Sequence, residues 1–175
     1  CQDGLSRVTL GNFLIKRVVF EIQEELPNIK NFGTLSPIPG FRDWFVNLDE
    51  KLVKNILGNI PLENISFLKS SSLKIGDTRI ISNKNAIYKL VAHYLMNEKN
   101  SKQLPINDVC RFHLGNGAII DDIVINANIS EVGFKRSFGV MVNYLYELKN
   151  IEKNHEEYIN KKTTIISNKV KKLIQ

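Results

Sequence analysis

The 175-residue chain contains few of the residues that build metal and disulfide sites. Its two cysteines, Cys1 and Cys110, do not form the spacing of a metal or redox motif. No second histidine or carboxylate stands at ligand spacing from His113, so we expect no metal site. We expect Cys110 to be a small helix residue rather than a nucleophile. So little cysteine also favours a reducing compartment.

Long apolar runs are also missing. No stretch approaches the roughly 20 apolar residues that a membrane-spanning helix needs, so the sequence predicts no membrane span. Internal repeats and low-complexity linkers are absent too, which favours one domain over residues 1–175. The first residue is Cys1 rather than Met, and we expect the chain to be a fragment of a longer protein.

Acidic residues are missing from the end of the chain. The formal net charge is +6, and five lysines between residues 161 and 175 have no acidic residue among them. The remainder is nearly neutral, whereas a nucleic-acid-binding fold carries its basic face on the fold itself. We therefore expect no nucleic-acid partner and interpret the basic tail, from about residue 160, as a solvated helical face.

The segment from Thr34 to Phe41 reads TLSPIPGF and holds one hydroxyl between an apolar run and two prolines. Ser36 and Ile38 each precede a proline, which favours extended backbone, and Gly40 permits a sharp turn. The pattern predicts a strand that ends in a stiff corner, with Ser36 at its carboxyl end. Ligands of open α/β sheets bind at such ends. A rigid surface turn with an incidental serine is the alternative.

A helix is predicted from Asn12 to Pro27, after a strand end and turn that begin at Leu5. Gly11 interrupts the strand pattern immediately before the helix. A glycine turn that opens a helix presents unpaired backbone N–H groups, which suit a phosphate. Simple strand-to-helix packing explains the same pattern.

A third segment of interest surrounds His113. His113 and Asn116 stand three residues apart, so they share a face of a helical turn, and Gly115 and Gly117 follow closely. We expect Asp108 to cap this helix. An isolated histidine at such a position is often structural, and that interpretation stays open. The other two histidines are expected at a rim (His93) and in solvent (His155).

The remaining pattern predicts an α/β or α+β fold. The first two strands would be parallel through the first helix, and the last two, at 118–126 and 138–146, would pair antiparallel. Tyr144 and Tyr146 are expected as half-buried sheet aromatics. Val140, Val142, Tyr144 and Tyr146 share one face of the last strand. Helices are expected at 41–48, 52–57, 87–95, 130–136 and 151–158.

Together these segments resemble the malonyl-CoA decarboxylase family. The resemblance runs in order from about Gly4 to about Tyr158 and rests on GNFLIK at 11–16, LSPIPGF at 35–41, FHL at 112–114, NGA at 116–118, AHYL at 92–95, MVNY at 141–144 and EKNH at 152–155. It implies a catalytic domain of the GNAT acyltransferase fold, a mixed sheet flanked by helices, of which this chain is the later part. The family's helical amino-terminal domain and the early strands would be absent.

The resemblance implies conversion of malonyl-CoA to acetyl-CoA and carbon dioxide in fatty-acid and malonate metabolism, with no metal or organic cofactor. Ser36 falls on the family's catalytic serine and His113 on its catalytic histidine. Asn143 and Tyr146 fall on positions that line the same site, and we add Asn116 as a substrate-binding residue. The segment Ser6 to Asn12 takes the place of the pyrophosphate loop, with Thr9, Gly11 and Asn12 as the residues for the CoA phosphates. We expect the full-length protein to be a homo-oligomer in a bacterial cytoplasm or a mitochondrial matrix.

Four positions depart from the family pattern. Thr9 stands where some members carry a site glutamate, and Asp108 replaces a common proline. Ile125 and Asn128 replace a common tryptophan and aspartate. These changes leave Ser36 and His113 intact and alter only the surroundings of the site.

The chemistry fits the residue types. Loss of carbon dioxide from a malonyl thioester leaves an enolate, which hydrogen-bond donors aimed at its oxygen stabilise. We expect His113 to titrate near neutrality and to act as general acid, with Ser36 hydrogen-bonding the malonyl carboxylate or the thioester. An acyl-serine intermediate is not required. The alternatives are acyl-CoA N-acyltransfer and a non-catalytic CoA-binding or assembly module.

Overall fold

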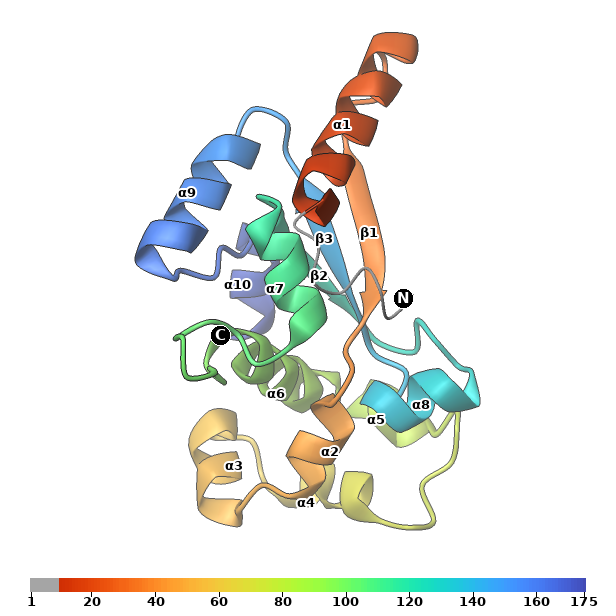
Figure 1. Ribbon diagram of the computed structural model, residues 1–175. Coiled ribbons are helices and arrows are strands. Elements are labelled where there is room, and N and C mark those ends of the chain that lie inside the picture. Colours follow the sequence, from red (N-terminus) through yellow and green to blue (C-terminus); the bar gives the residue numbers. More distant parts are fainter. Residues whose placement is uncertain (1–9) are drawn as a thin grey trace.

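A three-stranded antiparallel sheet forms the centre of the computed structural model, which describes residues 10–175 (Figure 1). The strands are β1 (Phe32–Pro37), β2 (Ile119–Val124) and β3 (Met141–Tyr146), and β3 lies between the other two. The predicted antiparallel pairing of the last two strands is confirmed, as is the α+β class. The predicted first strand falls mainly on residues outside the described part, so its parallel pairing, and with it a mixed sheet, stays a prediction.

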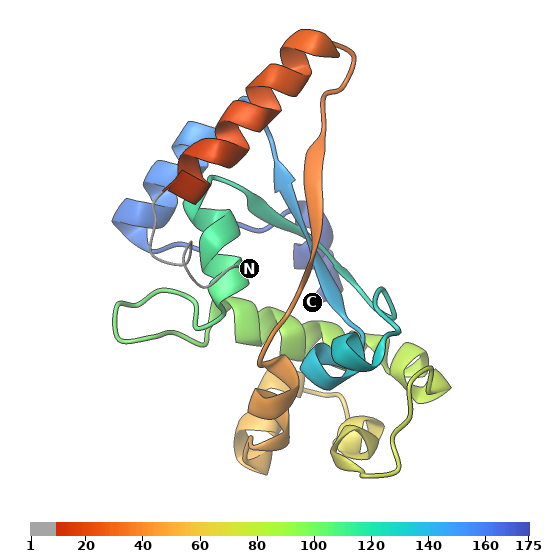
Figure 2. The ribbon, with the colours of Figure 1, turned by 45° about the vertical axis from the view of Figure 1, so that its right-hand side comes forward.

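Helices make up most of the remaining described structure. They are α1 (Leu10–Glu25), α2 (Phe41–Val46), α3 (Glu50–Leu57), α4 (Glu63–Ser66, followed by a 3-10 turn at Phe67–Lys69), α5 (Thr78–Ser82), α6 (Lys84–Met96), α7 (Asp108–Gly115), α8 (Glu131–Ser137), α9 (Ile151–Lys161) and α10 (Asn168–Leu173). The helices α2 to α5 pack against α6, which crosses beneath the sheet (Figure 2). Within residues 10–175, no helix is long and apolar enough to cross a membrane.

The first helix begins earlier than predicted. Because α1 starts at Leu10, Gly11 and Asn12 lie inside its first turn, and the predicted glycine turn at Gly11 is wrong. Helix boundaries vary by one or two residues, but helical backbone at both positions replaces the predicted interruption. Thr9 lies outside the described residues. At its other end α1 stops just before Pro27, as expected from the missing backbone N–H of proline.

The proline corner forms as predicted. β1 ends at Pro37, and Gly40 adopts a left-handed φ of 81° as the residue that opens α2. Tyr94 Oη and Asn107 Nδ2 both donate hydrogen bonds to the Pro39 carbonyl, at 3.0 and 2.9 Å. The corner that follows Ser36 is thus held by side chains from α6 and from the start of α7.

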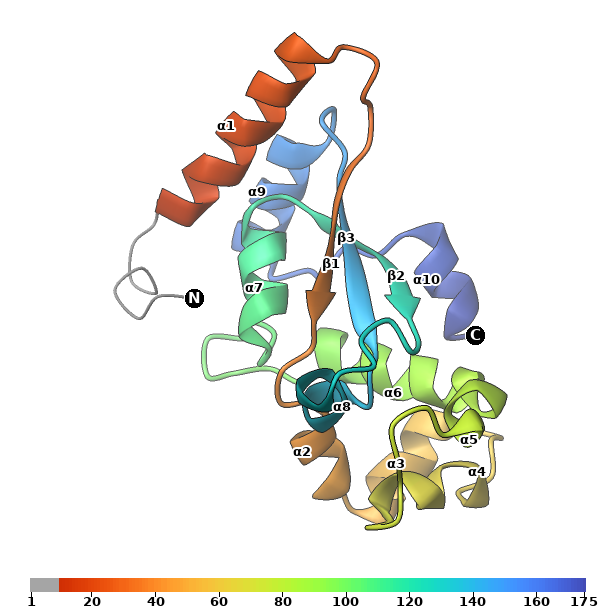
Figure 3. The same cartoon turned by 90° about the vertical axis from the view of Figure 1, so that its right-hand side faces the viewer.

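The two faces of the sheet differ in their cover. Thr34 and Ser36 of β1 lie opposite Tyr144 and Val142 of β3, and this face is covered by α7 (Figure 3). On the other face Leu35, opposite Asn143, is 51% exposed. Tyr144 and Tyr146 are 1% and 2% exposed, so they are fully buried rather than half-buried as predicted. Packing of α7 directly on β3 is the reason.

The helix that carries His113 is capped by Asn107, whose side chain accepts from the Cys110 N–H at 2.8 Å. The prediction that Asp108 caps it is wrong by one residue, since Asp108 is the first residue of the helix itself. Cys110 is fully buried, and burial raises the pKa of its thiol to about 12, as befits a packing residue rather than a nucleophile.

The basic tail packs on the sheet through one side. Ile166 forms a parallel bridge with Ile120 of β2, and Val170 of α10 is buried. The neighbouring lysines Lys169, Lys171 and Lys172 are exposed. The interpretation of the tail as a solvated helical face is therefore confirmed for α10.

Candidate active site

Ser36 and His113 meet across the interface between the sheet and α7. Ser36 Oγ lies 3.0 Å from His113 Nε2, although the two residues are 77 positions apart in the chain. Both side chains are buried. Ser36 comes from the end of β1, where the proline corner holds the backbone, and His113 from the last turn of α7. The structure thus brings the two predicted catalytic residues into one hydrogen-bonded pair.

Two tyrosines of β3 fix the imidazole of His113. Tyr146 Oη lies 2.7 Å from His113 Nδ1, so the second ring nitrogen also has a partner. The ring of Tyr144 stacks on the imidazole, with centroids 4.3 Å apart and 17° between the planes. Alternation along β3 places both tyrosines on the face covered by α7. The ring has little freedom to rotate.

Burial changes the protonation of this site. It lowers the pKa of His113 from its ordinary value to about 4, and it raises the pKa of Tyr146 well above its usual range. His113 is therefore a neutral imidazole at pH 7 in the free protein. The expectation that it titrates near neutrality is wrong for this state, because the side chain is removed from water.

A third hydroxyl joins the pair. Ser36 Oγ donates to Thr34 Oγ1 at 3.2 Å. The sequence interpretation did not assign Thr34 to the site. The signal was present, since residues two apart in a strand share a face.

Asn116 has a different environment from the one predicted. It follows α7 as its C-cap, and its side chain is 0% exposed. Its Nδ2 donates to the Phe112 carbonyl at 2.7 Å, while its Oδ1 has no partner in the described part of the chain. The structure places Asn116 as a group that closes the end of α7, shut off from solvent.

Asn143 is not brought to the pair. It alternates with Tyr144 along β3 and lies opposite the exposed Leu35, on the face that α7 does not cover. Its Nδ2 donates to Asp121 Oδ2 at 3.4 Å. The thickness of the sheet separates this side chain from His113, whereas Tyr146, predicted with it, contacts the imidazole directly.

Three of the four departures from the family pattern, those at Asp108, Ile125 and Asn128, lie outside the hydrogen-bonded pair. Asn128 Oδ1 accepts from the Ser130 N–H and hydroxyl at the start of α8, and Asp108 pairs with Arg111. Ile125 is partly buried against the core. In the described structure none of them hydrogen-bonds Ser36, His113 or Tyr146. Thr9 cannot be placed, since it precedes the described residues.

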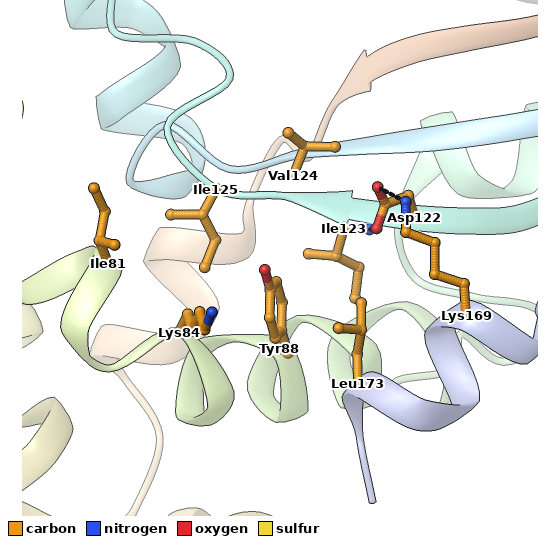
Figure 4. Close-up of a pocket in the computed structure, with 9 residues that line it drawn as sticks. All are labelled: Ile81, Lys84, Tyr88, Asp122, Ile123, Val124, Ile125, Lys169 and Leu173. Carbon is orange, nitrogen blue, oxygen red and sulfur yellow. Dashed lines mark hydrogen bonds and ion pairs between the residues drawn. The ribbon is translucent and has the colours of Figure 1, made fainter.

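A cavity of about 380 Å³ lies elsewhere, between the edge strand β2 and the helices α6 and α10 (Figure 4). An ion pair between Lys169 and Asp122 (2.5 Å) stands at its edge. The residues that line it are Ile81, Lys84, Tyr88, Asp122, Ile123, Val124, Ile125, Lys169 and Leu173. None is a serine, a cysteine or a histidine, so this cavity holds no pair like that of Ser36 and His113. Within residues 10–175, no cluster of histidine, cysteine and acidic side chains could hold a metal ion.

Known proteins are similar to this chain in sequence and in structure. A family model described as Malonyl-CoA decarboxylase C-terminal domain matches residues 1–175. Mitochondrial malonyl-CoA decarboxylase of Mus musculus is 34% identical, over 99% of this chain and 39% of that protein. The protein of that name from Anser anser anser is also 34% identical, over 92% of this chain and 35% of that protein.

Two solved structures are also similar to this chain. Malonyl-CoA decarboxylase from Cupriavidus metallidurans superposes with a TM-score of 0.79 at 35% identity, over 97% of this chain and 45% of that one. The structure from Rhodopseudomonas palustris gives a TM-score of 0.75 at 36% identity, over 99% and 40%. The chain thus spans less than half the length of each of these four relatives. On the match of the family model to every residue and on these relatives, the chain belongs to the malonyl-CoA decarboxylase family.

Proposed function

We propose that the protein containing this chain converts malonyl-CoA to acetyl-CoA and carbon dioxide, and that Ser36 and His113 carry the reaction. The buried hydrogen bond of 3.0 Å between these two side chains is the observation that carries the proposal. The relatives support the proposal as well, because proteins that are similar to almost the whole chain are named malonyl-CoA decarboxylases. The proposal requires neither a metal nor an organic cofactor.

The first step breaks the bond between the malonyl carboxylate and the α-carbon. Carbon dioxide leaves, and the electron pair becomes an enolate with its charge on the thioester oxygen. An N–H of His113 can stabilise this oxygen, and so can the hydroxyl of Ser36 once the substrate oxygen replaces Thr34 Oγ1 as the acceptor of its proton. The burial of both side chains strengthens the interaction. A neutral imidazole is suited to such a role, because its single N–H donates a hydrogen bond although the ring carries no net charge.

The second step places a proton on the α-carbon. In this proposal His113 takes up a proton from solvent while the negatively charged substrate or enolate is bound beside it. The proton on His113 Nε2 then passes to the enolate carbon, which completes acetyl-CoA and leaves His113 as the neutral imidazole again. A negatively charged substrate next to His113 raises the pKa of the imidazole, which opposes the effect of burial. A larger fraction of His113 is thus protonated in the complex than its pKa of about 4 in the free protein implies.

Binding of the CoA phosphates is proposed for the start of α1. Gly11 and Asn12 lie in its first turn, where backbone N–H groups have no partner within the helix. Thr9 precedes the described residues and stays part of the proposal. Asn116 and Asn143 were predicted to bind substrate. We propose that they instead support the site indirectly, Asn116 at the end of α7 and Asn143 on the far face of β3.

Location and assembly remain proposals as well. Relatives named mitochondrial come from animals, whereas the solved structures come from bacteria. We propose a bacterial cytoplasm or a mitochondrial matrix, and a homo-oligomer for the full-length protein. Malonyl-CoA is the proposed small-molecule partner, without nucleic acid.

The chain spans less than half of its relatives, which favours one alternative for this piece alone: a non-catalytic CoA-binding or assembly module. Mass spectrometry of malonyl-CoA incubated with the chain, and with the natural full-length protein, separates the two. His113→Gln should lower acetyl-CoA formation about 10²-fold or more. His93→Gln is the matched control, since His93 stacks on Trp44 away from the pair.

Normal turnover by His113→Gln would contradict the assignment of His113. CoA binding without acetyl-CoA from the full-length protein would favour the binding module. Transfer of an acetyl group from acetyl-CoA to an added amine would instead favour the N-acyltransferase.

A further inference from the structure

We propose that Thr34 is a positioning residue, whose hydroxyl oxygen accepts the proton of Ser36 and thereby sets the direction of the hydrogen-bond chain that ends at Tyr146. This inference rests on the proposed function for its consequence, but the direction of the chain is a property of the free protein. It follows from counting the protons available to four side chains.

Ser36 has one hydroxyl proton. That proton is donated to Thr34 Oγ1 at 3.2 Å. At the second contact of Ser36, 3.0 Å from His113 Nε2, the serine oxygen must therefore accept. The donor in that contact is Nε2, which must carry the single N–H of the neutral imidazole.

The other end of the chain gives the same direction independently. Tyr146 is 2% exposed, and its hydroxyl has only His113 Nδ1 as a partner in the described structure, at 2.7 Å. If Nδ1 carried the proton, the Tyr146 O–H would be a buried donor without an acceptor, which is unfavourable. With the proton on Nε2, the Tyr146 hydroxyl donates to Nδ1 and each of these protons has an acceptor.

The strand geometry explains why Thr34 can do this. Thr34 and Ser36 are two apart in β1 and point to the same face, opposite Tyr144 and Val142. Threonine is branched at Cβ, which restricts its side chain and keeps Oγ1 in place. Thr34 is half-buried and acts through Ser36.

The consequence is that His113 holds its proton on the nitrogen that faces Ser36 before any substrate arrives. Without the Thr34 hydroxyl, the Ser36 proton has no acceptor except Nε2. Donation there would move the imidazole proton to Nδ1, so that Nε2 could no longer donate a hydrogen bond to the thioester oxygen in the proposed reaction. A threonine that contacts no reacting atom would therefore control whether His113 presents an N–H to the substrate.

Nitrogen-15 NMR of labelled histidine tests the direction directly, because the two neutral tautomers have different ring-nitrogen shifts. The chain has three histidines, so His93→Gln and His155→Gln complete the assignment. His155 is an internal reference: its Nδ1 lies 2.6 Å from the Gly115 carbonyl oxygen and must donate, so at pH 8 it should show the opposite tautomer. We expect protonated Nε2 for His113 in the wild type and in Thr34→Ser, and a mixture of tautomers in Thr34→Val.

Kinetics of the full-length protein give the second reading. Thr34→Val keeps the shape of the side chain and suits a strand, so the fold should survive. We expect its kcat to fall about 10-fold, the equivalent of one ordinary hydrogen bond, with KM unchanged and with kcat restored in Thr34→Ser. Thr163→Val, on the surface after α9, is the control.

Protonated Nδ1 at His113 in the wild type, or a Thr34→Val protein with an unchanged spectrum and kcat, would overturn the inference. A wild type that makes no acetyl-CoA yet shows the expected tautomers would refute the proposed function and leave the role of Thr34 in place.

Discussion

The imidazole of His113 lies flat against the ring of Tyr144, 4.3 Å between centroids and 17° from parallel. Tyr144 covers one side of the imidazole, while Ser36 and Tyr146 occupy its two nitrogens. Water therefore has little access to the ring, and burial holds the pKa of His113 near 4. This enclosure has a measurable effect on the stability of the whole domain.

Acid should destabilise the protein through His113. The folded-state pKa of about 4 lies below the ordinary 6.5, so between these values the unfolded chain binds a proton that the folded chain does not. The contribution of His113 to the free energy of unfolding is then fully present above pH 6.5. It is lost as the pH falls toward 4, and the total loss is about 3 kcal/mol. Urea titrations from pH 4 to 8 measure this. His113→Gln should lack the His113 part of the slope, and equal slopes in the two proteins would contradict the assignment.

Tyr146→Phe should lower both stability and turnover. The change leaves His113 Nδ1 buried without a donor, at a cost of about 1–3 kcal/mol, and kcat should fall about 10-fold because the tautomer is no longer fixed. Tyr158→Phe is the matched control, since the Tyr158 hydroxyl is buried and has no partner in the described structure. We expect its free energy of unfolding to be unchanged or slightly higher. Denaturant unfolding and acetyl-CoA formation measure both effects, and equal losses in the two variants would count against the hydrogen-bond chain that ends at Tyr146.

Ser36→Ala separates two roles of the serine. If Ser36 only donates and accepts hydrogen bonds, kcat should fall about 10- to 10³-fold, as for loss of one oxyanion donor. No acyl-enzyme should then be detected in the wild type. Intact-protein mass spectrometry after rapid acid quenching, beside the Ser36→Ala rates, decides this. A mass increase of one acyl group on Ser36 would replace the hydrogen-bonding role with a covalent one.

Gly117→Ala should be strongly destabilising. Gly117 has φ of 82° in the turn between α7 and β2, and an added Cβ would collide with the backbone carbonyl of Ile151 at the start of α9. We expect a loss of about 3 kcal/mol or more, from backbone strain and the forced shift of α9. Gly58→Ala is the control, because it has a similar φ of 63° and nothing within 4 Å, so about 1–2 kcal/mol is expected. Thermal unfolding of both variants measures the difference.

Local chemistry made some of these features predictable. Two prolines and Gly40 restrict the backbone directly, so the corner after Ser36 could be predicted from eight residues. The alternation along β3 also predicted which of its side chains share a face. Since Asn143 alternates with Tyr144, that same pattern already put it on the opposite face of the strand from Tyr146, although the resemblance had assigned both Asn143 and Tyr146 to one site.

Other features depend on packing that a linear pattern does not carry. Nothing near Ser36 in the chain indicates that His113 lies 3.0 Å from it, and only the family resemblance linked them. The low pKa of His113 likewise follows from the tyrosines and helices around it. His155 was expected in solvent, yet it is half-buried and bonded to the Gly115 carbonyl, which required knowing that α9 packs on α7.

The long separation between β1 and β3 bears on how the protein folds. Phe32 to Pro37 pair with residues 141–146, so this pairing closes a loop of more than a hundred residues. Contacts of such high sequence separation form slowly compared with helices. Ser36 and His113 should therefore meet after most helical structure is present, and acetyl-CoA formation should recover later than far-ultraviolet circular dichroism during refolding. Simultaneous recovery would indicate that the strand pairing belongs to the folding nucleus itself.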